Sequence, residues 1–272
     1  MIRKKAFMVA GTVAGIVCAI FFASGARPAH AQTVPTANAQ TSAASSTDCG
    51  ITPASLAQIN VIENDPTLTP SQEVVQELAM RKQLIIQAIT CAQSDIRSLQ
   101  SLLSAVPTST DAERSIKSQL QGRIDDASNF YLLELGKLGG AGIAGTKTIA
   151  GDVLAWREGT YVPLEGQVGD FILWAGNQQL FATAQERMTE TQQAVSFIES
   201  ASNNADLQSV FNAAYASFET AKNGNSAAEA GLQQSLPPDQ TLVLIKQSLD
   251  ALQETYQQFF KVSGIIQNLL PQ

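Results

Sequence analysis

Apolar residues recur at alternating steps of three and four along most of the chain from Thr69 onward, which is the spacing of one face of an α-helix. The clearest run predicts a helix from Thr69 to about Val106, with apolar positions at Val75, Leu78, Ile85, Ile89, Ala92, Ile96, Leu99, Leu103 and Val106. At 1.5 Å per residue this helix would be about 50 Å long. A stripe of that length indicates coiled-coil-like packing against a partner helix.

A second helix is predicted directly after Pro107, which ends the first one. Thr110 and Glu113 have the spacing of a capping box at its start. Its apolar face is formed by Ile116, Leu120, Ile124, Ala127, Tyr131, Leu135 and Leu138. Gly139 and Gly140 end it. Because the turn between the two helices is short, they are expected to be antiparallel neighbours.

The rest of the chain also has helical spacing, and no useful window alternates at the period of two that a strand requires. A short helical turn is predicted before the first long helix, over residues 53–62. Later helices are predicted over residues 146–158, 167–201, 205–222, 226–235 and from Pro237 to about Leu270. The predicted fold class is therefore all-α, an elongated bundle of long antiparallel helices with coiled-coil-like seams.

The N-terminus has the pattern of a secretory signal peptide over residues 1–31. Three basic residues at positions 3–5 precede an uncharged apolar stretch over 6–26, and the small residues Ala29 and Ala31 fit a cleavage site. The apolar stretch is also long enough to span a bilayer, so an uncleaved membrane anchor over 6–26 is the alternative. Either interpretation exports the rest of the chain to the periplasm, the cell surface or the medium.

Two further segments complete the predicted domain organisation. Residues 32–48 are almost entirely Ala, Ser, Thr, Gln and Asn, which predicts a flexible spacer. Residues 49–272 are predicted to form a single helical-bundle domain that contains a Gly-rich connector at 139–145.

The charge of the chain narrows the classes of partner. The 272 residues include 17 Lys and Arg against 24 Asp and Glu, a net charge of −7. Removal of residues 1–31 would leave 241 residues with 13 basic and 24 acidic side chains, a net charge of −11. This excess of negative charge disfavours nucleic acid as a partner.

The same cleavage would remove the only histidine, His30. Catalysis of the Ser-His-Asp or Cys-His type and histidine metal sites are then excluded from the exported part. Two cysteines would remain, Cys49 and Cys91. In an oxidising compartment their simplest state is one disulfide, and two buried free thiols are the alternative.

Residues 156–174 gather both tryptophans, a tyrosine, a proline and several glycines. Aromatic residues among Gly and Pro are typical of recognition surfaces. An interaction patch is therefore predicted at Trp156, Arg157 and Tyr161, whereas Trp174 is expected in the core.

Three carboxylates lie in or beside the same segment, at Glu158, Glu165 and Asp170. Paired carboxylates beside aromatic rings could perform the acid and base steps of a glycan-cleaving enzyme. A simpler explanation is that solvation and the helix dipole favour acids at such positions. Catalysis is therefore kept only as an alternative.

The Gly-rich segment allows two further interpretations. Gly140 to Gly145 matches the pattern GxGxxG, but a helix rather than a strand precedes it, which favours a helix terminator over a nucleotide site. The apolar segment 138–156 between long helices resembles the layout of α-helical pore-forming toxins. That resemblance implies a mobile apolar head that contacts a membrane, although Lys147 and Asp152 interrupt it.

The sequence therefore favours an exported, non-enzymatic helical-bundle protein that acts by protein–protein contact in the cell envelope or at the cell surface, as in a secretion or pilus assembly. The expected partners are envelope or surface proteins, together with self-association through the helical seams. No cofactor and no metal are expected. Membrane contact is expected only through an uncleaved anchor or in the toxin alternative.

Overall fold

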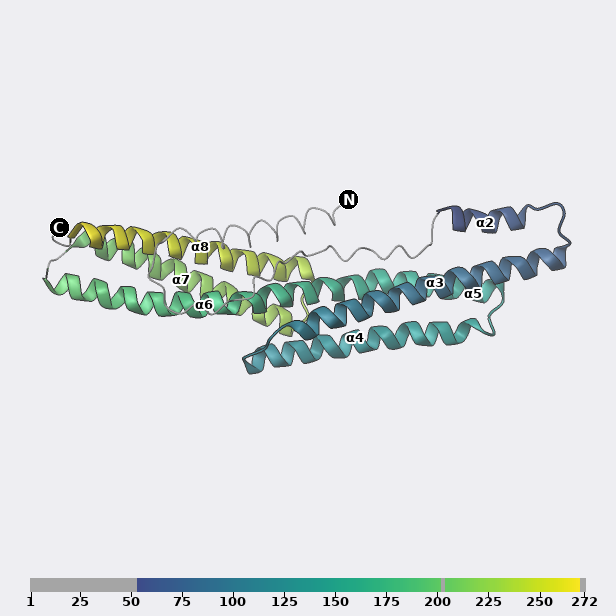
Figure 1. The fold of residues 1–272 in the computed structure, drawn as a ribbon, viewed down its shortest axis with the longest axis horizontal. Helices are drawn as coiled ribbons and strands as arrows, with labels where there is room; N and C mark the ends of the chain where they lie inside the picture. Colours follow the sequence, from purple (N-terminus) through teal and green to yellow (C-terminus); the bar gives the residue numbers. More distant parts are fainter. Residues whose placement is uncertain (1–52, 202–203, 270–272) are drawn as a thin grey trace. The chain divides into compact units, whose positions relative to one another are not determined.

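The computed structural model describes residues 53–201 and 204–269, and every described element is helical (Figure 1). The predicted all-α helical bundle is confirmed. In chain order the elements are α2 (Pro53–Glu63), α3 (Pro70–Ala105), α4 (Asp111–Leu138), α5 (Ile143–Trp156), the π-helix η1 (Arg157–Tyr161), α6 (Val162–Ala201), α7 (Ala205–Gln233) and α8 (Pro238–Leu269). The predicted signal peptide or anchor, the spacer and Cys49 lie outside the described residues.

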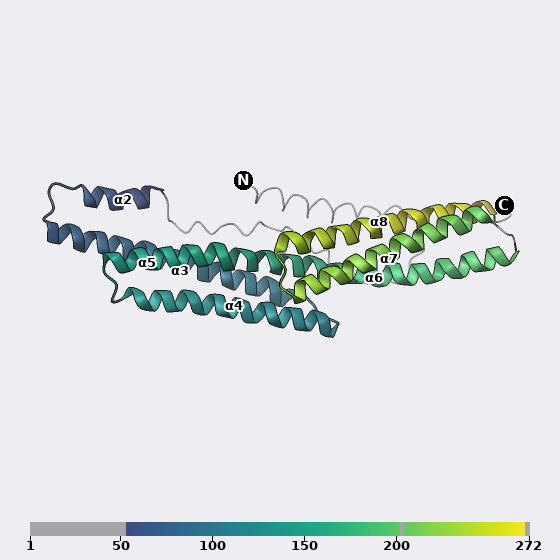
Figure 2. The same cartoon turned by 180° about the vertical axis from the view of Figure 1, so that it is seen from behind.

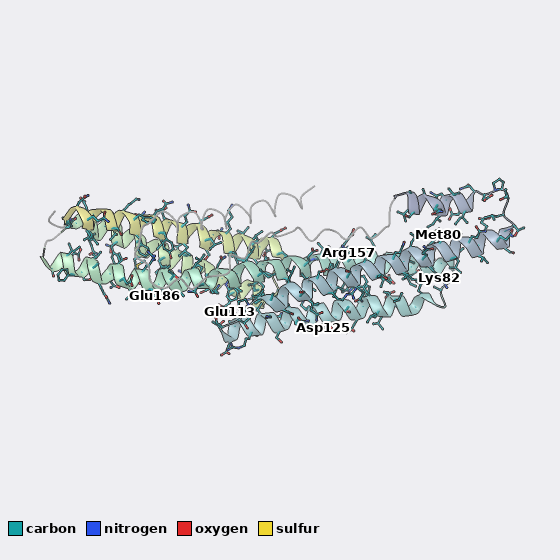
Figure 3. The ribbon with its side chains drawn as sticks, in the orientation of Figure 1. Met80, Lys82, Glu113, Asp125, Arg157 and Glu186 are labelled. Atoms are coloured by element: carbon teal, nitrogen blue, oxygen red, sulfur yellow. The ribbon has the colours of Figure 1, made fainter. Side chains whose placement is uncertain are left out.

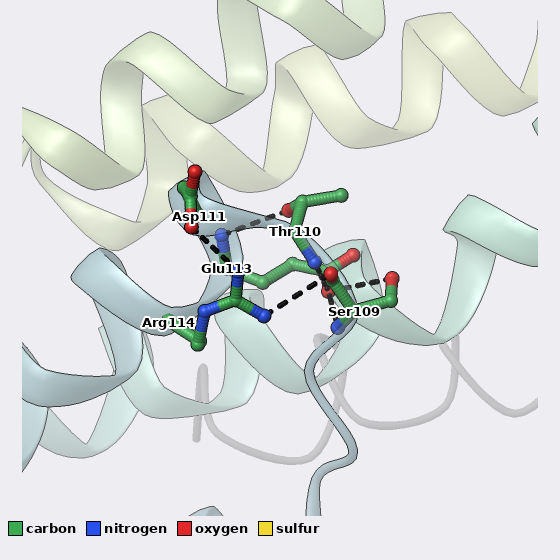
Figure 4. A network of polar contacts seen from close by, with 5 residues as sticks. All are labelled: Ser109, Thr110, Asp111, Glu113 and Arg114. Atoms are coloured by element: carbon green, nitrogen blue, oxygen red, sulfur yellow. Dashed lines mark hydrogen bonds and ion pairs between the residues drawn. The ribbon is translucent and has the colours of Figure 1, made fainter.

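The starts of α3 and α4 are set by side chains that satisfy backbone groups. The Thr110 hydroxyl accepts a hydrogen bond from the Glu113 amide at 3.1 Å, and the Glu113 carboxylate accepts one from the Thr110 amide at 3.0 Å (Figure 4). This is the predicted capping box. Thr69 and Gln72 form a second one at the start of α3.

Replacement of Thr110 by Ala is expected to lower the free energy of unfolding by about 1 kcal/mol, because the Glu113 amide loses its acceptor. Thr148→Ala is the matched control, since Thr148 lies exposed in the middle of α5, where Ala has the higher helix propensity. Urea titration of both variants measures the difference. An equal loss in both variants would contradict the role assigned to the cap.

The first apolar core lies between α3, α4, α5, η1 and the first half of α6, and Ala228 and Leu232 of α7 and Ile245 of α8 also belong to it. Its most deeply buried members follow the predicted stripes of α3 and α4, and Leu103, Ala127 and Tyr131 have no exposed surface. Val75 departs from its stripe and is 66% exposed. The reason is that α4 ends beside Lys82, whose ammonium donates to the Gly139 carbonyl, so the earlier turns of α3 extend beyond α4.

The expected loop between residues 158 and 167 is absent, and α5, η1 and α6 run on as one helix. Pro163 has no N–H, and its ring would clash with the carbonyl of residue 159 in a regular α-helix. The π-turn widens the backbone at this point, with the Val162 amide donating to the Arg157 carbonyl. The predicted helices 205–222 and 226–235 likewise form one helix, α7, and α5 begins at Ile143 within the expected connector.

The second half of α6 packs with α7 and α8 around a second apolar core (Figures 1 and 2). Small residues allow α7 and α8 to approach closely. Every seventh residue of each helix is at most 2% exposed: Leu207, Ala214, Ala221 and Ala228 on α7, and Thr241, Ser248, Thr255 and Val262 on α8. A Cβ on Gly224 would lie only 3.2 Å from the Ser248 Cα. Thus α6 is shared by two cores.

Candidate functional site

The predicted interaction patch is largely engaged within the chain. The Trp156 ring stacks on Phe130 with a centroid distance of 4.4 Å and meets Tyr131 edge-on at 5.4 Å. Tyr161 is 2% exposed, so the expectation that it is a surface residue is wrong. Since η1 continues the helix, Tyr161 lies on the same buried side as Leu164 and Val168, which point into the first core.

Arg157 ties η1 to the neighbouring helix α3. Its guanidinium lies 3.5 Å from the Asp95 carboxylate and 5.4 Å from the centre of the Tyr161 ring. Burial raises the pKa of Tyr161, and it also raises the pKa of Tyr131, against the opposing effect of Arg157. Both phenols therefore stay neutral, and the group holds helices together rather than supplying a reactive side chain.

The structure does not bring the three candidate carboxylates together. Glu158 and Glu165 are exposed, whereas Asp170 is 4% exposed and lies near Asp239 at the start of α8. A shallow depression on α6 is lined by Gln185, Glu186, Thr189 and Glu190 and contains none of the three. Over residues 53–201 and 204–269 no group of three His, Cys, Asp or Glu side chains could hold a metal ion.

The region around Asp170 is a buried polar junction that sequence analysis missed. The side-chain Nε2 of Gln167 donates to the Ser235 and Leu236 backbone carbonyls at 3.0 Å each, and the Arg123 guanidinium donates to Oε1 of Gln167. Ser235 has a φ of 55°, a left-handed conformation that costs a non-glycine residue free energy. These contacts hold the α7–α8 turn against α4 and α6.

Asp170 is a buried carboxyl group beside this junction. Its Oδ2 atom is buried and makes no hydrogen bond with any described residue. Burial, together with the nearby negative charge of Asp239, raises the pKa of Asp170 to about 7. One signal in the sequence could have indicated that the Asp170 carboxyl is buried. Its helical position is flanked by the apolar residues Val168, Phe171 and Trp174.

The segment expected as a toxin head is a packed helix. Thr146 and Ile149 of α5 are 1% and 5% exposed, and Val153 and Trp156 also pack against the first core. Among the described helices, none combines the length and the apolar character needed to cross a membrane. Cys91 is buried in α3, and its pairing with Cys49 stays a prediction.

Several large aliphatic side chains of α4 and of the neighbouring helix α3 are exposed to solvent. Leu132, Leu133 and Leu135 of α4 are 54%, 67% and 37% exposed, and Ile86 of α3 is 45% exposed. Two cross-helix hydrogen bonds, Lys82 to Gly139 and Gln93 to Ser128, set one antiparallel register, which places Ile86 opposite Leu135. These four residues are called the α4 face below.

The chain matches no protein-family model, and no curated protein and no solved structure is similar to it. The function is therefore inferred from the geometry and the sequence of this chain alone.

Proposed function

We propose that this chain is an exported, non-enzymatic helical-bundle protein that binds another protein in the cell envelope or at the cell surface, in an assembly such as a secretion or pilus apparatus. The observation that carries the proposal is the α4 face, where three leucines within one turn of α4 and Ile86 of the neighbouring helix α3 are 37–67% exposed. Export rests on the N-terminal pattern of basic, apolar and small residues.

The exposed side chains of the α4 face would gain free energy by leaving water. Full burial of a leucine or isoleucine contributes about 1.5–3 kcal/mol relative to the exposed state. Single exposed hydrophobic residues are ordinary, but a cluster of several on neighbouring helices is typical of a contact surface. A partner that covers the α4 face would recover this free energy.

The arrangement of the acidic residues supports contact over catalysis. A glycosidase requires two carboxyl groups that flank one bond. Here Asp170 is buried between α6 and the start of α8, whereas Glu158 and Glu165 are exposed to solvent.

Photo-crosslinking on intact cells tests the proposal. A photoreactive residue placed at Leu132 is expected to give one discrete crosslinked product, which a second substitution, Leu133→Asp, abolishes. Leu102 is the matched control, because it is 52% exposed on α3 but lies far along that helix from Ile86. No product from position 132, or the same product from both positions, would contradict the proposal.

A further inference from the structure

The exposed side of α4 has an ordered distribution of charge around its leucines. Leu132 and Leu133 lie at the centre, Asp125 and Asp126 lie about 10 Å towards the N-terminus of the helix, and Lys137 lies about 7 Å towards its C-terminus. All five side chains are exposed, and Figure 3 labels Asp125 on this helix. One end of the face is therefore acidic, the middle apolar and the other end basic.

Two glycines on the same side of α4 have no packing role among the described residues. Gly122 and Gly136 are exposed, and no atom of residues 53–201 or 204–269 lies within 4 Å of the place a Cβ would occupy on either. Glycine inside a helix costs about 0.5–1 kcal/mol relative to alanine. Bare backbone at these positions permits another helix to approach closely, which an alanine or a larger residue would hinder.

We propose that a second copy of this chain docks on the α4 face, with the two α4 helices antiparallel about a two-fold axis near Leu132. The inference rests on the proposed function and names its partner. An isologous contact of this kind uses the same surface on both copies. The leucines of the two copies then meet at the axis, and Asp126 of each copy lies opposite Lys137 of the other, because these two positions lie on the same side of α4.

The distribution of charge along α4 favours an antiparallel pair of α4 helices, with a second copy of the chain as the partner. A parallel pair of α4 helices would place acid against acid and lysine against lysine, whereas the antiparallel pair makes two favourable contacts. Lys137 is available for this, because it keeps 59% of its side chain exposed while it pairs with Glu134 at 2.5 Å. Lys82 adds a second ammonium at the basic end, where it lies beside Gly139.

Charge exchange between two variants tests the inference by sedimentation. The first variant carries Asp125→Lys and Asp126→Lys, and the second carries Lys137→Asp. Each variant alone would face like charges across the axis, and at least a 10-fold weaker self-association is expected from loss of about 1.4 kcal/mol. An equimolar mixture is expected to recover association, because both contacts in the mixed pair join opposite charges.

The controls separate this effect from misfolding. Glu186→Lys with Glu190→Lys reverses two exposed charges on α6, away from the α4 face, and is expected to leave association unchanged. Circular dichroism checks the fold of each variant. Since Lys137→Asp places a second carboxylate beside the buried Glu134, Lys137→Gln serves as the milder variant, because it removes the ion pair without adding a negative charge, and a smaller loss is expected.

Three results would overturn the inference. The first is a monomeric wild-type protein, purified with its N-terminus as the producing cell processes it. The second is a dimer whose association the charge variants do not change. The third is a mixture of the two variants that does not recover association. If the wild-type chain is monomeric while position 132 crosslinks to a different protein, the inference is wrong and the proposed function stands. If position 132 gives no crosslink and the chain is monomeric, both are wrong.

Discussion

Replacement of Asp170 by Asn is expected to abolish a pH dependence by which the wild-type protein is less stable at pH 8 than at pH 5. The carboxyl has a pKa of about 7 in the folded chain, against a reference value of 3.8. The folded state therefore holds a proton that the unfolded state releases. The contribution of Asp170 to stability is greatest below pH 3.8 and falls as the pH rises to about 7, by up to about 4 kcal/mol.

Urea titrations at pH 5 and pH 8 measure this difference. The interval avoids Glu113, because hydrogen bonds from Ser109 and Thr110 hold its pKa below the usual value of 4.5, so it stays ionised throughout. Glu158→Gln, at an exposed position on η1, is the control and is expected to keep the wild-type difference. A wild-type protein that is more stable at pH 8, or an Asp170→Asn variant that keeps the difference, would contradict the role assigned to Asp170.

Replacement of Ala221 by Leu is expected to destabilise the protein by about 3 kcal/mol or more, through overpacking of the contact between α7 and α8. Ala221 has no exposed surface, and its carbonyl accepts a hydrogen bond from the Ser248 hydroxyl at 2.8 Å. Three additional carbon atoms at this position must push α8 away. That displacement would break the hydrogen bond and open the second core.

Thermal unfolding of a matched pair of variants checks this expectation. Ala216 lies on the exposed side of the same helix, so Ala216→Leu adds the same atoms where solvent can accommodate them. Little change in stability is expected there. Similar stability of the two variants would contradict this expectation, because it would show that the contact between α7 and α8 can accommodate a leucine at position 221.

Local signals explain why the helices of the first core could be predicted from the sequence. The start of α4 depends on Thr110 and Glu113, three residues apart, and its buried stripe follows the helical period. Residues 158–167 were mispredicted because Gly159, Pro163 and Gly166 are typical of loops. Gly166 in fact serves a tertiary contact, since a Cβ there would lie 2.7 Å from Pro238 of α8. No neighbouring residue reveals that contact.

Whether a candidate residue is buried or exposed also depends on contacts with residues far away in the sequence. Asp170 was identified as a carboxylate of interest, but its burial depends on α8, which begins 68 residues later. The α4 face was partly visible in the sequence, because Leu132 and Leu133 lie off the apolar stripe of their helix. Leu135 lies on that stripe and is nevertheless 37% exposed, since it lies at the edge of α4 opposite Ile86.

The continuous helix from Ile143 to Ala201 has a consequence for how the protein loses its structure. The first half of α6 belongs to one core and its second half to the other. Unfolding of either core therefore removes apolar contacts from a helix that also packs in the other core. The junction around Gln167 further joins α4 to the α7–α8 turn. We therefore expect the two halves to unfold together in a single cooperative transition rather than as separable domains.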